Sequence, residues 1–279
     1  MRLVRYFSQV TRAVLPRELS IDEIKAVSEA CPNDLSLEVF VHGALCYGVS
    51  GRCYWSSFLG GRSGLRGRCV QPCRRIYGQD EKHGRFFSCQ DLWLDVLTKI
   101  LLEVPKLAAL KIEGRKKGPH YVYYTTAAYR LLRDHAGDPD AKKKALSLLE
   151  DALGRKPTHY RFLPQRPWNP IDTSAQTGSG KLMGRVQGPG SKPYMAPRED
   201  LLAGDLLRIG YEDESWHRTY RVTRSVPKKG RLYLKLSEKE RPANGTPVFL
   251  LDRREPELAD EMARLSETLK TLDTPAVKP

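Results

Sequence analysis

The sequence predicts an α/β fold in which a partial β/α barrel is followed by a small antiparallel β-barrel. Three observations support this fold class. Apolar segments of strand length alternate with amphipathic helical segments over residues 1–155. A stretch rich in Pro, Gly and Ser then covers 156–197. Beyond it, short apolar runs are separated by turn sequences such as PKKG and PANG, which is typical of antiparallel strands.

The first elements are a strand, a helix and a second strand. Residues 12–16 have the composition of a short buried strand. Ser20 and Glu23 have the spacing of a capping box, which predicts a helix running to about residue 30. Residues 35–41 predict the second strand. Because two strands joined by a helix usually pair in parallel, we expect a parallel sheet.

The later elements continue the alternation. Asp91 is expected to cap a helix over 91–104, a third strand covers about 108–113, and two helices follow from Pro119 and over 141–153. Three or four strands fall short of the eight in a closed TIM-like barrel. The sequence therefore predicts the C-terminal part of such a barrel with its N-terminal half missing, through a miscalled start, a truncated gene or a separate partner chain.

We expect four parts along the chain. They are the partial β/α barrel with its cysteine-rich segment at 1–155, a Pro/Gly-rich linker at 156–197, the small β-barrel at 198–255, and a C-terminal helix and tail at 256–279. The GSGK sequence in the linker is not a phosphate-binding loop, because the full Walker spacing and a preceding strand are both missing.

The composition favours a basic protein of the cytoplasm. The chain has 47 Lys and Arg against 33 Asp and Glu, a net charge of +14. Such a surface attracts polyanions, nucleic acid above all, although many basic proteins carry Lys for solubility alone. No apolar run is long enough to span a bilayer, and the first residues lack the apolar core of a secretory signal. In the cytoplasm, clustered cysteines more often hold a metal or do redox chemistry than form disulfides.

Five of the six cysteines lie in one segment, at Cys46, Cys53, Cys69, Cys73 and Cys89. Their spacings lack the C-x-x-C pair of zinc ribbons and thioredoxin-type sites, although four thiolates could still hold zinc. Iron–sulfur clusters tolerate wider loops. Backbone N–H groups of nearby glycines could donate to cluster sulfides, and nearby arginines would offset the cluster's charge: Gly48, Gly51, Gly60, Gly61, Arg52, Arg66 and Arg68. The other interpretation is five thiols that bind no metal.

Residues 38–53, EVFVHGALCYGVSGRC, resemble the signature of the collagenase-like U-32 peptidase family. GGRSGLRGRCVQPCR and KIEGRKKGPHYV are further hallmarks, and the similarity runs from about residue 10 to 135. The resemblance implies a β/α barrel that binds a [4Fe–4S] cluster. Members include hydroxylases of a pyrimidine in tRNA or rRNA, which take the oxygen from prephenate. Others hydroxylate a ubiquinone precursor without oxygen as pairs of related chains, and the family name comes from a collagen-degrading activity.

The same resemblance assigns cluster ligands by motif. Cys46, Cys53 and Cys69 are three of them. For the fourth we favour Cys89, with Cys73 as the alternate. Relatives often carry a cysteine in a DLC motif where this chain has Trp93. Cys31 stands apart, and we expect it to be a small buried apolar residue.

Charged residues near the predicted barrel mouth are catalytic candidates. Lys111, Glu113 and Arg115 lie two apart at the end of a strand, so we expect them on one face at the mouth. Lys111 and Arg115 would suit prephenate or an RNA phosphate, whereas the alternative is an internal ion-pair network with Glu113. His42 could share a face with Glu38 and act as a peptidase base. The simpler interpretation is a packed histidine beside the cluster.

Three functions remain open at this point. The first is a cluster-dependent enzyme that hydroxylates a pyrimidine base of tRNA or rRNA, with the small barrel helping to hold the RNA. The second is a peptidase, although the sequence has no H-E-x-x-H or G-x-S-x-G motif and no convincing Cys–His–Asn set. The third is a non-catalytic RNA-binding or partner subunit, because the predicted barrel is incomplete. Iron and sulfide analysis after anaerobic purification separates the first from the second.

Overall fold

The computed structural model describes residues 10–115, 117–163, 165, 169–173, 180–212, 216–237 and 241–270. The chain divides into two compact units, Met1–Ser179 and Gly180–Pro279. The first unit is mixed α/β, and the second is built on an antiparallel sheet.

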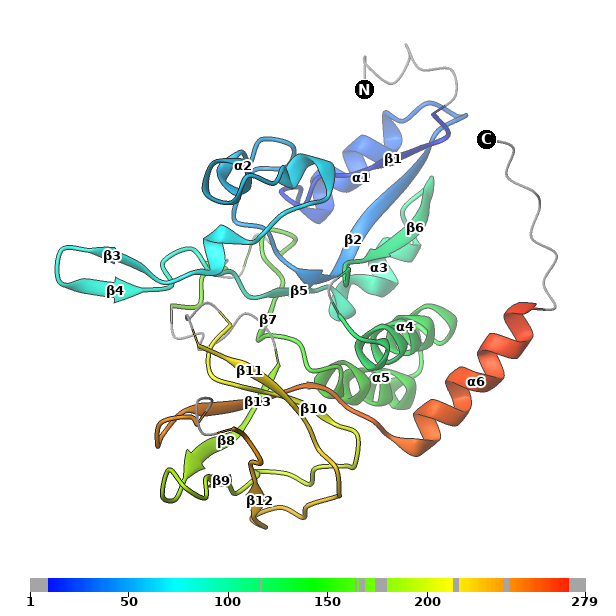
Figure 1. Ribbon diagram of the computed structural model, residues 1–279. Helices are drawn as coiled ribbons and strands as arrows, with labels where there is room; N and C mark the ends of the chain where they lie inside the picture. The colour runs from blue at the N-terminus through cyan, green and yellow to red at the C-terminus, as the bar shows by residue number, and fades with distance from the viewer. Residues whose placement is uncertain are drawn as a thin grey trace. The chain divides into compact units, whose positions relative to one another are not determined.

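The first unit is organised around β2 (Ser36–Ala44), the central strand of its sheet. β1 (Arg12–Val14) and β6 (Leu107–Ile112) pair with β2 in parallel. β5 (Asp91–Trp93) pairs antiparallel with the C-terminal end of β2, and β7 (Pro157–Thr158) lies parallel to β5 (Figure 1). The expectation of a purely parallel sheet is therefore wrong at β5, and the sheet is mixed.

Four helices of this unit each bury one face in its core. They are α1 (Ile21–Glu29), α3 (Thr98–Leu102), α4 (Pro119–Asp134) and α5 (Pro139–Asp151). The predicted capping box is confirmed at α1, where the Ser20 hydroxyl accepts from the backbone N–H of Glu23 and the Glu23 carboxylate accepts from that of Ser20.

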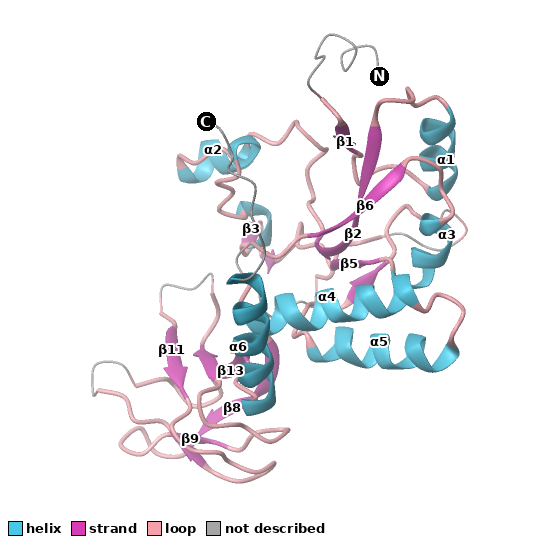
Figure 2. Ribbon diagram, turned by 90° about the vertical axis from the view of Figure 1, so that its right-hand side faces the viewer, coloured by secondary structure: helices cyan, strands magenta, loops and turns pink. Residues whose placement is uncertain are grey.

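The cysteine-rich segment forms the long connection from β2 to β5. It contains α2 (Trp55–Gly60), two 3-10 turns at Gly64–Arg66 and Pro72–Arg74, and a hairpin of β3 (Tyr77–Gln79) and β4 (Lys82–Gly84). In Figures 1 and 2, α2 lies apart from α4 and α5. The segment is therefore an ordered insertion at one end of β2.

Residues 91–104 do not form the single helix expected from the sequence. Asp91–Trp93 form β5, a 3-10 turn follows at Asp95–Leu97, and α3 begins only at Thr98. The backbone of β5 pairs with both β2 and β7. These strands satisfy the hydrogen-bonding groups that a helix would have satisfied internally. A short apolar run fits either structure, so periodicity could not distinguish them.

The second unit contains a curled sheet of six strands in the order β11–β10–β13–β8–β9–β12, and every adjacent pair is antiparallel. The strands are β8 (Lys181–Gln187), β9 (Tyr194–Met195), β10 (Leu206–Ile209), β11 (Arg218–Arg221), β12 (Leu232–Tyr233) and β13 (Pro247–Asp252). The predicted C-terminal helix is α6 (Pro256–Lys270).

Three strands lie inside the stretch expected to be a linker, namely β7, β8 and β9. Gly184 interrupts the apolar pattern of β8. A Cβ at this position would lie 2.8 Å from the carbonyl oxygen of Ala196, so the close approach of two backbones requires glycine there. A glycine of this kind hides a strand from pattern analysis.

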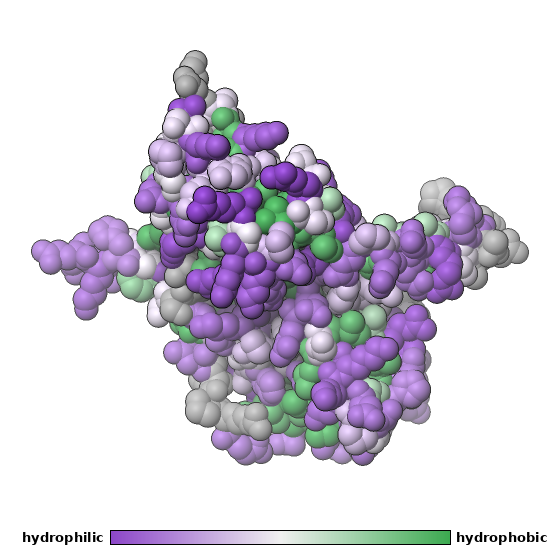
Figure 3. Space-filling model, turned by 90° about the horizontal axis from the view of Figure 1, so that it is seen from below, coloured by the Kyte–Doolittle hydropathy of each residue, from purple (hydrophilic) through white to green (hydrophobic). Residues whose placement is uncertain are grey.

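The surface is polar over most of the face drawn in Figure 3, where hydrophobic side chains gather only in smaller patches. Among the helices of the described residues, none combines the length and the apolar character needed to cross a membrane.

Gly43 fixes the contact between β2 and the end of β6. Its backbone has φ +120°, and an added Cβ would lie 2.3 Å from the carbonyl oxygen of Glu113. Next to it, the backbone N–H of Glu113 donates to the carbonyl of His42 at 2.8 Å. Only glycine permits this close approach with this conformation.

We expect Gly43→Ala to lower the free energy of unfolding by roughly 3 kcal/mol, because it adds both backbone strain and a steric clash. Gly137→Ala is the matched control, since an added Cβ there meets nothing within 4 Å. Its effect should stay within about 0.5 kcal/mol. Urea unfolding followed by circular dichroism measures both, and equal stabilities for the two variants would contradict this account.

Candidate functional site

Pairing of β2 with β5 brings the two ends of the cysteine-rich segment together. Ala44, the last residue of β2, lies opposite Asp91, the first residue of β5. Cys46 follows Ala44 by two positions and Cys89 precedes Asp91 by two. The sheet thus places these two cysteines at the same end of β2, although they lie far apart in the sequence.

Arg74 holds this junction from inside. Its side chain is buried, and its guanidinium donates to the carbonyls of Leu45 at 2.8 Å and of Cys89. It also donates to the Ser88 hydroxyl at 3.3 Å. Burial lowers the pKa of Arg74, as does Arg155 nearby, while Asp91 acts in the opposite direction. An arginine remains charged under these conditions, so a positive charge lies buried among the thiols.

The thiols of Cys73 and Cys89 lie in this buried region. Burial raises the pKa of Cys73 to about 11, with Arg74 opposing the change and Cys46, Cys89 and Cys69 adding to it. Burial likewise raises the pKa of Cys89 to about 11, with Arg74 opposing and Cys46 contributing. Cys73 is thus within electrostatic reach of Cys46, Cys69 and Cys89, and Cys89 is within reach of Cys46.

Cys53 packs against Gly48, and Gly64 lies beside both Cys69 and the backbone of Cys53. The Sγ of Cys53 lies 3.3 Å from the position that a Cβ of Gly48 would occupy. A Cβ at Gly64 would lie 3.7 Å from the Cβ of Cys69 and 3.9 Å from the carbonyl oxygen of Cys53. The Sγ of Cys69 accepts the backbone N–H of Gln71 at 3.3 Å, which is the kind of contact that stabilises a thiolate.

The candidate donors are thiols, which are the ligands that hold iron–sulfur clusters in proteins. Within the described residues, no three His, Cys, Asp or Glu side chains are placed to hold one metal ion. A cubane cluster separates its four thiolates more widely than one ion does, because several irons and sulfides stand between them. Gathered thiols, a backbone N–H donor to sulfur and a buried arginine match the surroundings that such a cluster needs.

His42 is a buried, uncharged histidine in an aromatic surrounding. It is 1% exposed, and its ring centroid lies 5.4 Å from that of Trp93 and 5.6 Å from that of Tyr129. Its Nδ1 lies 3.4 Å from the Tyr129 hydroxyl, while its Nε2 has no hydrogen-bond partner among the described residues. Burial lowers the pKa of His42 to about 4, although Asp91 acts to raise it.

Lys111 pairs with Glu38 rather than with Glu113. The two charged groups lie 2.6 Å apart, and the Lys111 ammonium also lies 5.7 Å from the centre of the Phe40 ring. Glu38 is therefore the partner of a lysine and is not placed as the orienting group for His42.

Glu113 and Arg115 follow β6, which ends at Ile112, so the strand alternation does not reach them. Glu113 contacts its neighbours through its backbone, since its carbonyl accepts the Tyr121 hydroxyl at 3.1 Å. Arg115 is exposed, and one of its terminal nitrogens lies 3.3 Å from where a Cβ of Gly67 would be. The end of β6 thus reaches the cysteine-rich segment through Arg115.

Asp91 and Arg155 form a buried ion pair that sequence analysis did not identify. Asp91 is fully buried, and Arg155 donates to it through its side chain at 3.0 Å and its backbone at 3.1 Å. Burial alone would raise the pKa of Asp91, but Arg155 and Lys117 hold it below its usual value. Neither residue belongs to a recognisable motif. Arg74 could not be singled out either, because the sequence does not distinguish it from the adjacent Arg75.

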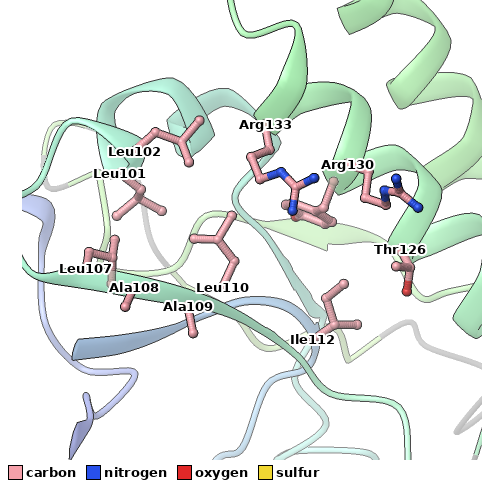
Figure 4. Close-up of a pocket in the computed structure, with 11 residues that line it drawn as sticks. Leu101, Leu102, Leu107, Ala108, Ala109, Leu110, Ile112, Thr126, Arg130 and Arg133 are labelled. Atoms are coloured by element: carbon pink, nitrogen blue, oxygen red, sulfur yellow. The ribbon is translucent and has the colours of Figure 1, made fainter. Parts of the chain in front are cut away.

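Two hollows lie near these residues. A narrow one, lined by Arg17, Phe40, His42 and Glu113 among others, has a volume of about 10 Å³, enough for about one water molecule. A larger pocket of about 350 Å³ lies between α3, β6 and α4. Figure 4 shows its apolar side chains from α3 and β6 and the arginines Arg130 and Arg133 from α4. No cysteine or catalytic candidate lines this larger pocket.

Comparison with known proteins places these features in a family. The sequence model of peptidase family U32 matches residues 2–169. The chain is 32% identical over 186 residues to a tRNA hydroxylation protein P from Helicobacter pylori, covering 61% of this chain and 44% of that protein. It is 41% identical over 132 residues to a 23S rRNA 5-hydroxycytidine synthase from Escherichia coli, covering 44% of this chain and 20% of that protein.

A collagenase from Porphyromonas gingivalis is 32% identical over 151 residues, covering 46% of this chain and 35% of that protein. The chain thus spans less than half the length of these curated relatives. No solved structure matches the chain significantly.

We expect Arg74→Gln to lower the free energy of unfolding by about 2–4 kcal/mol, because buried acceptors on both ends of the segment lose a charged donor. Arg75→Gln is the matched control, since Arg75 is the exposed neighbour. It should change stability by less than about 0.5 kcal/mol. Thermal and urea unfolding test the pair, and a neutral Arg74→Gln would show that the junction does not need the guanidinium.

His42 should make the protein less stable in acid. Its pKa is about 4 when folded and 6.5 when unfolded, so the unfolded state binds the extra proton first as the pH falls. Stability is full above about pH 6.5 and declines towards pH 4 by roughly 3 kcal/mol at most. His42→Gln should flatten this part of the stability curve, measured by urea unfolding from pH 7 to 4. A curve with the same slope in both proteins would exclude His42 as the cause.

Proposed function

The chain belongs to peptidase family U32, and from this premise we propose that it is an iron–sulfur protein that hydroxylates a pyrimidine base of tRNA or rRNA with an oxygen donor like prephenate. The observation that carries the proposal is the gathering of thiols around the buried Arg74 at the end of β2. Relatives at modest identity are named as tRNA and rRNA hydroxylation proteins, and the strongly basic chain suits such a substrate.

Cys46, Cys53 and Cys69 would hold a [4Fe–4S] cluster together with Cys89 or, alternately, Cys73. The partly exposed thiol of Cys73 is within electrostatic reach of three other cysteines, whereas Cys89 is buried and shares the hydrogen-bonded junction made by Arg74. When bound, the cluster would supply redox-active iron at the C-terminal end of β2. Arg74 would offset the negative charge of a cluster with four thiolates.

The catalytic candidates have separate tasks in this proposal. Lys111 and Arg115 supply positive charge for the carboxylates of the oxygen donor or for an RNA phosphate. Lys111 is oriented by its ion pair with Glu38, and Arg115 reaches towards the cysteine-rich segment. His42 stays neutral at physiological pH, so it can offer a hydrogen bond but no charge. Glu113 fixes the end of β6 through its backbone.

A peptidase is the second candidate, because one relative is named a collagenase. A cysteine peptidase needs a thiol whose pKa is lowered so that the thiolate can attack. Cys73 and Cys89 have the opposite property, since burial raises the pKa of each to about 11. His42 is buried among aromatic rings rather than paired with a thiol or hydroxyl nucleophile. These observations favour the hydroxylase.

The ligand assignment is tested by iron and sulfide analysis of anaerobically purified variants. We expect Cys46→Ala to lose most of the iron, because one of the four ligands is removed. Cys31→Ala is the matched control. Cys31 is buried beside Leu35, to whose carbonyl it donates at 3.4 Å, and it lies outside the cysteine-rich segment. Comparison of Cys73→Ala with Cys89→Ala then identifies the fourth ligand. Equal iron in Cys46→Ala and Cys31→Ala would contradict the assignment.

The activity is tested by incubating the iron-loaded protein with total tRNA and rRNA and prephenate under anaerobic conditions. Mass spectrometry of the digested nucleosides should show a pyrimidine nucleoside heavier by one oxygen atom. Lys111→Met should reduce its yield at least about tenfold, because a carboxylate or phosphate loses its counter-charge. Unmodified RNA together with cleavage of gelatin by the same preparation would replace the hydroxylase with the peptidase.

A further inference from the structure

The segment from Tyr47 to Ile76 exposes an unusual number of large apolar side chains. Phe58 is 87% exposed and Tyr54 69%, and both belong to α2 or its N-terminal cap. The others in this segment are Tyr47, Val49, Leu59, Leu65 and Ile76. Tyr54 and Phe58 are four residues apart, so their rings lie on the same side of α2, and exposed aromatic groups placed together in this way are typical of a binding surface.

The charged residues of the segment itself have one sign, although the Glu18 carboxylate accepts the backbone N–H of Ser50 at 2.8 Å. Residues 39–79 contain no Asp or Glu, while arginines recur through the segment. Five of the arginines are exposed: Arg52, Arg62, Arg66, Arg68 and Arg75. Within the described part of the chain, no carboxylate forms an ion pair with any of them. A protein partner would ordinarily meet a mixture of charges, whereas a polyanion matches a surface of this kind.

Aromatic and hydrogen-bonding contacts on the inner side of this segment hold α2 in place. Phe87 contacts three other aromatic rings, with centroid distances of 5.1 Å to Trp55, 5.2 Å to Tyr47 and 5.4 Å to Tyr77. The buried hydroxyl of Ser56 donates to the carbonyl of Arg62 at 2.7 Å and accepts the backbone N–H of Val70 at 3.0 Å. These contacts fix α2 against the turns that follow, so the backbone that carries Tyr54 and Phe58 is held in place.

We propose that this face, Tyr47–Ile76, is a platform for unpaired RNA. Tyr54 and Phe58 stack against bases, and the surrounding arginines contact phosphates. Aromatic rings beside a basic surface are how proteins hold single strands, because every base offers a flat face for stacking. Cys53 directly precedes Tyr54, so a strand on the platform would lie next to the thiols. The choice of RNA as the polyanion rests on the proposed function. The exposed aromatic rings and the positive charge are features of the structure and sequence that do not depend on it.

Binding of a fluorescein-labelled, unstructured pyrimidine-rich RNA to the whole chain tests the platform by fluorescence anisotropy. Tyr54→Ala combined with Phe58→Ala should weaken binding by about tenfold or more, without changing its dependence on salt. Val122→Ala is the matched control, because it shortens an exposed apolar side chain on α4. It should bind as the unaltered protein does.

Substitution of the exposed arginines should change the salt dependence of RNA binding. Arg66→Gln with Arg68→Gln should lower the slope of log affinity against log salt by about 1.4, the value for two phosphate contacts on a single strand. Lys142→Gln with Lys143→Gln removes the same charge from α5 and should leave the slope nearly unchanged. Circular dichroism confirms that each variant is folded.

Unchanged RNA affinity in the Tyr54→Ala and Phe58→Ala variant would overturn the platform, and the proposed reaction would still stand. A dimer in the unaltered protein that this variant dissociates, with RNA affinity unchanged, would make the face a protein interface and also overturn it. Binding needs neither the cluster nor the oxygen donor. The two proposals can also separate in the other direction. If the variant loses RNA binding and the unaltered protein modifies no nucleoside, the platform stands and the proposed reaction is refuted.

Discussion

The guanidinium of Arg74 is the constraint on which the site depends, because it joins two parts of the chain that only the sheet brings together. β2 and β5 pair for three residues, and the segment between them must leave the sheet at Cys46 and return at Cys89. Arg74 bonds to the carbonyls of Leu45 and Cys89 at these two ends. A buried charge costs folding energy unless it is well bonded. The three hydrogen bonds of Arg74 meet this condition, and its charge also opposes the rise that burial causes in the pKa of Cys73 and Cys89.

The cysteine-rich segment has an inner side and an exposed side with different properties. On the inner side, burial raises the pKa of Cys73 and Cys89, which makes these two thiols poor nucleophiles. On the exposed side, the segment presents aromatic rings and exposed arginines. Gly48 allows Cys53 to pack closely against it, because an added Cβ there would lie 2.9 Å from the Cβ of Cys53. One insertion thus carries both a candidate cofactor site and a candidate RNA surface.

The sequence predicted features that local rules determine. The capping box at Ser20, the strand containing Leu37 and Val39, and the helix beginning at Pro119 all depend on short-range patterns and are confirmed. The strand at Asp91–Trp93 could not be predicted, because its pairing partners are distant in sequence. For the same reason, the partner of Lys111 was missed. Glu38 lies on the neighbouring strand β2, and only the register of β2 with β6 places the two side chains together. The cysteines were visible from composition, but Arg74 was not.

The central claim is that these thiols converge on one inorganic centre. The most direct measurement is the Mössbauer spectrum of the protein purified anaerobically from cells grown on iron-57. The account predicts the spectrum of a [4Fe–4S] cluster, with four irons and four sulfides for each chain. A protein that contains no iron, or only mononuclear iron bound without sulfide, would contradict it.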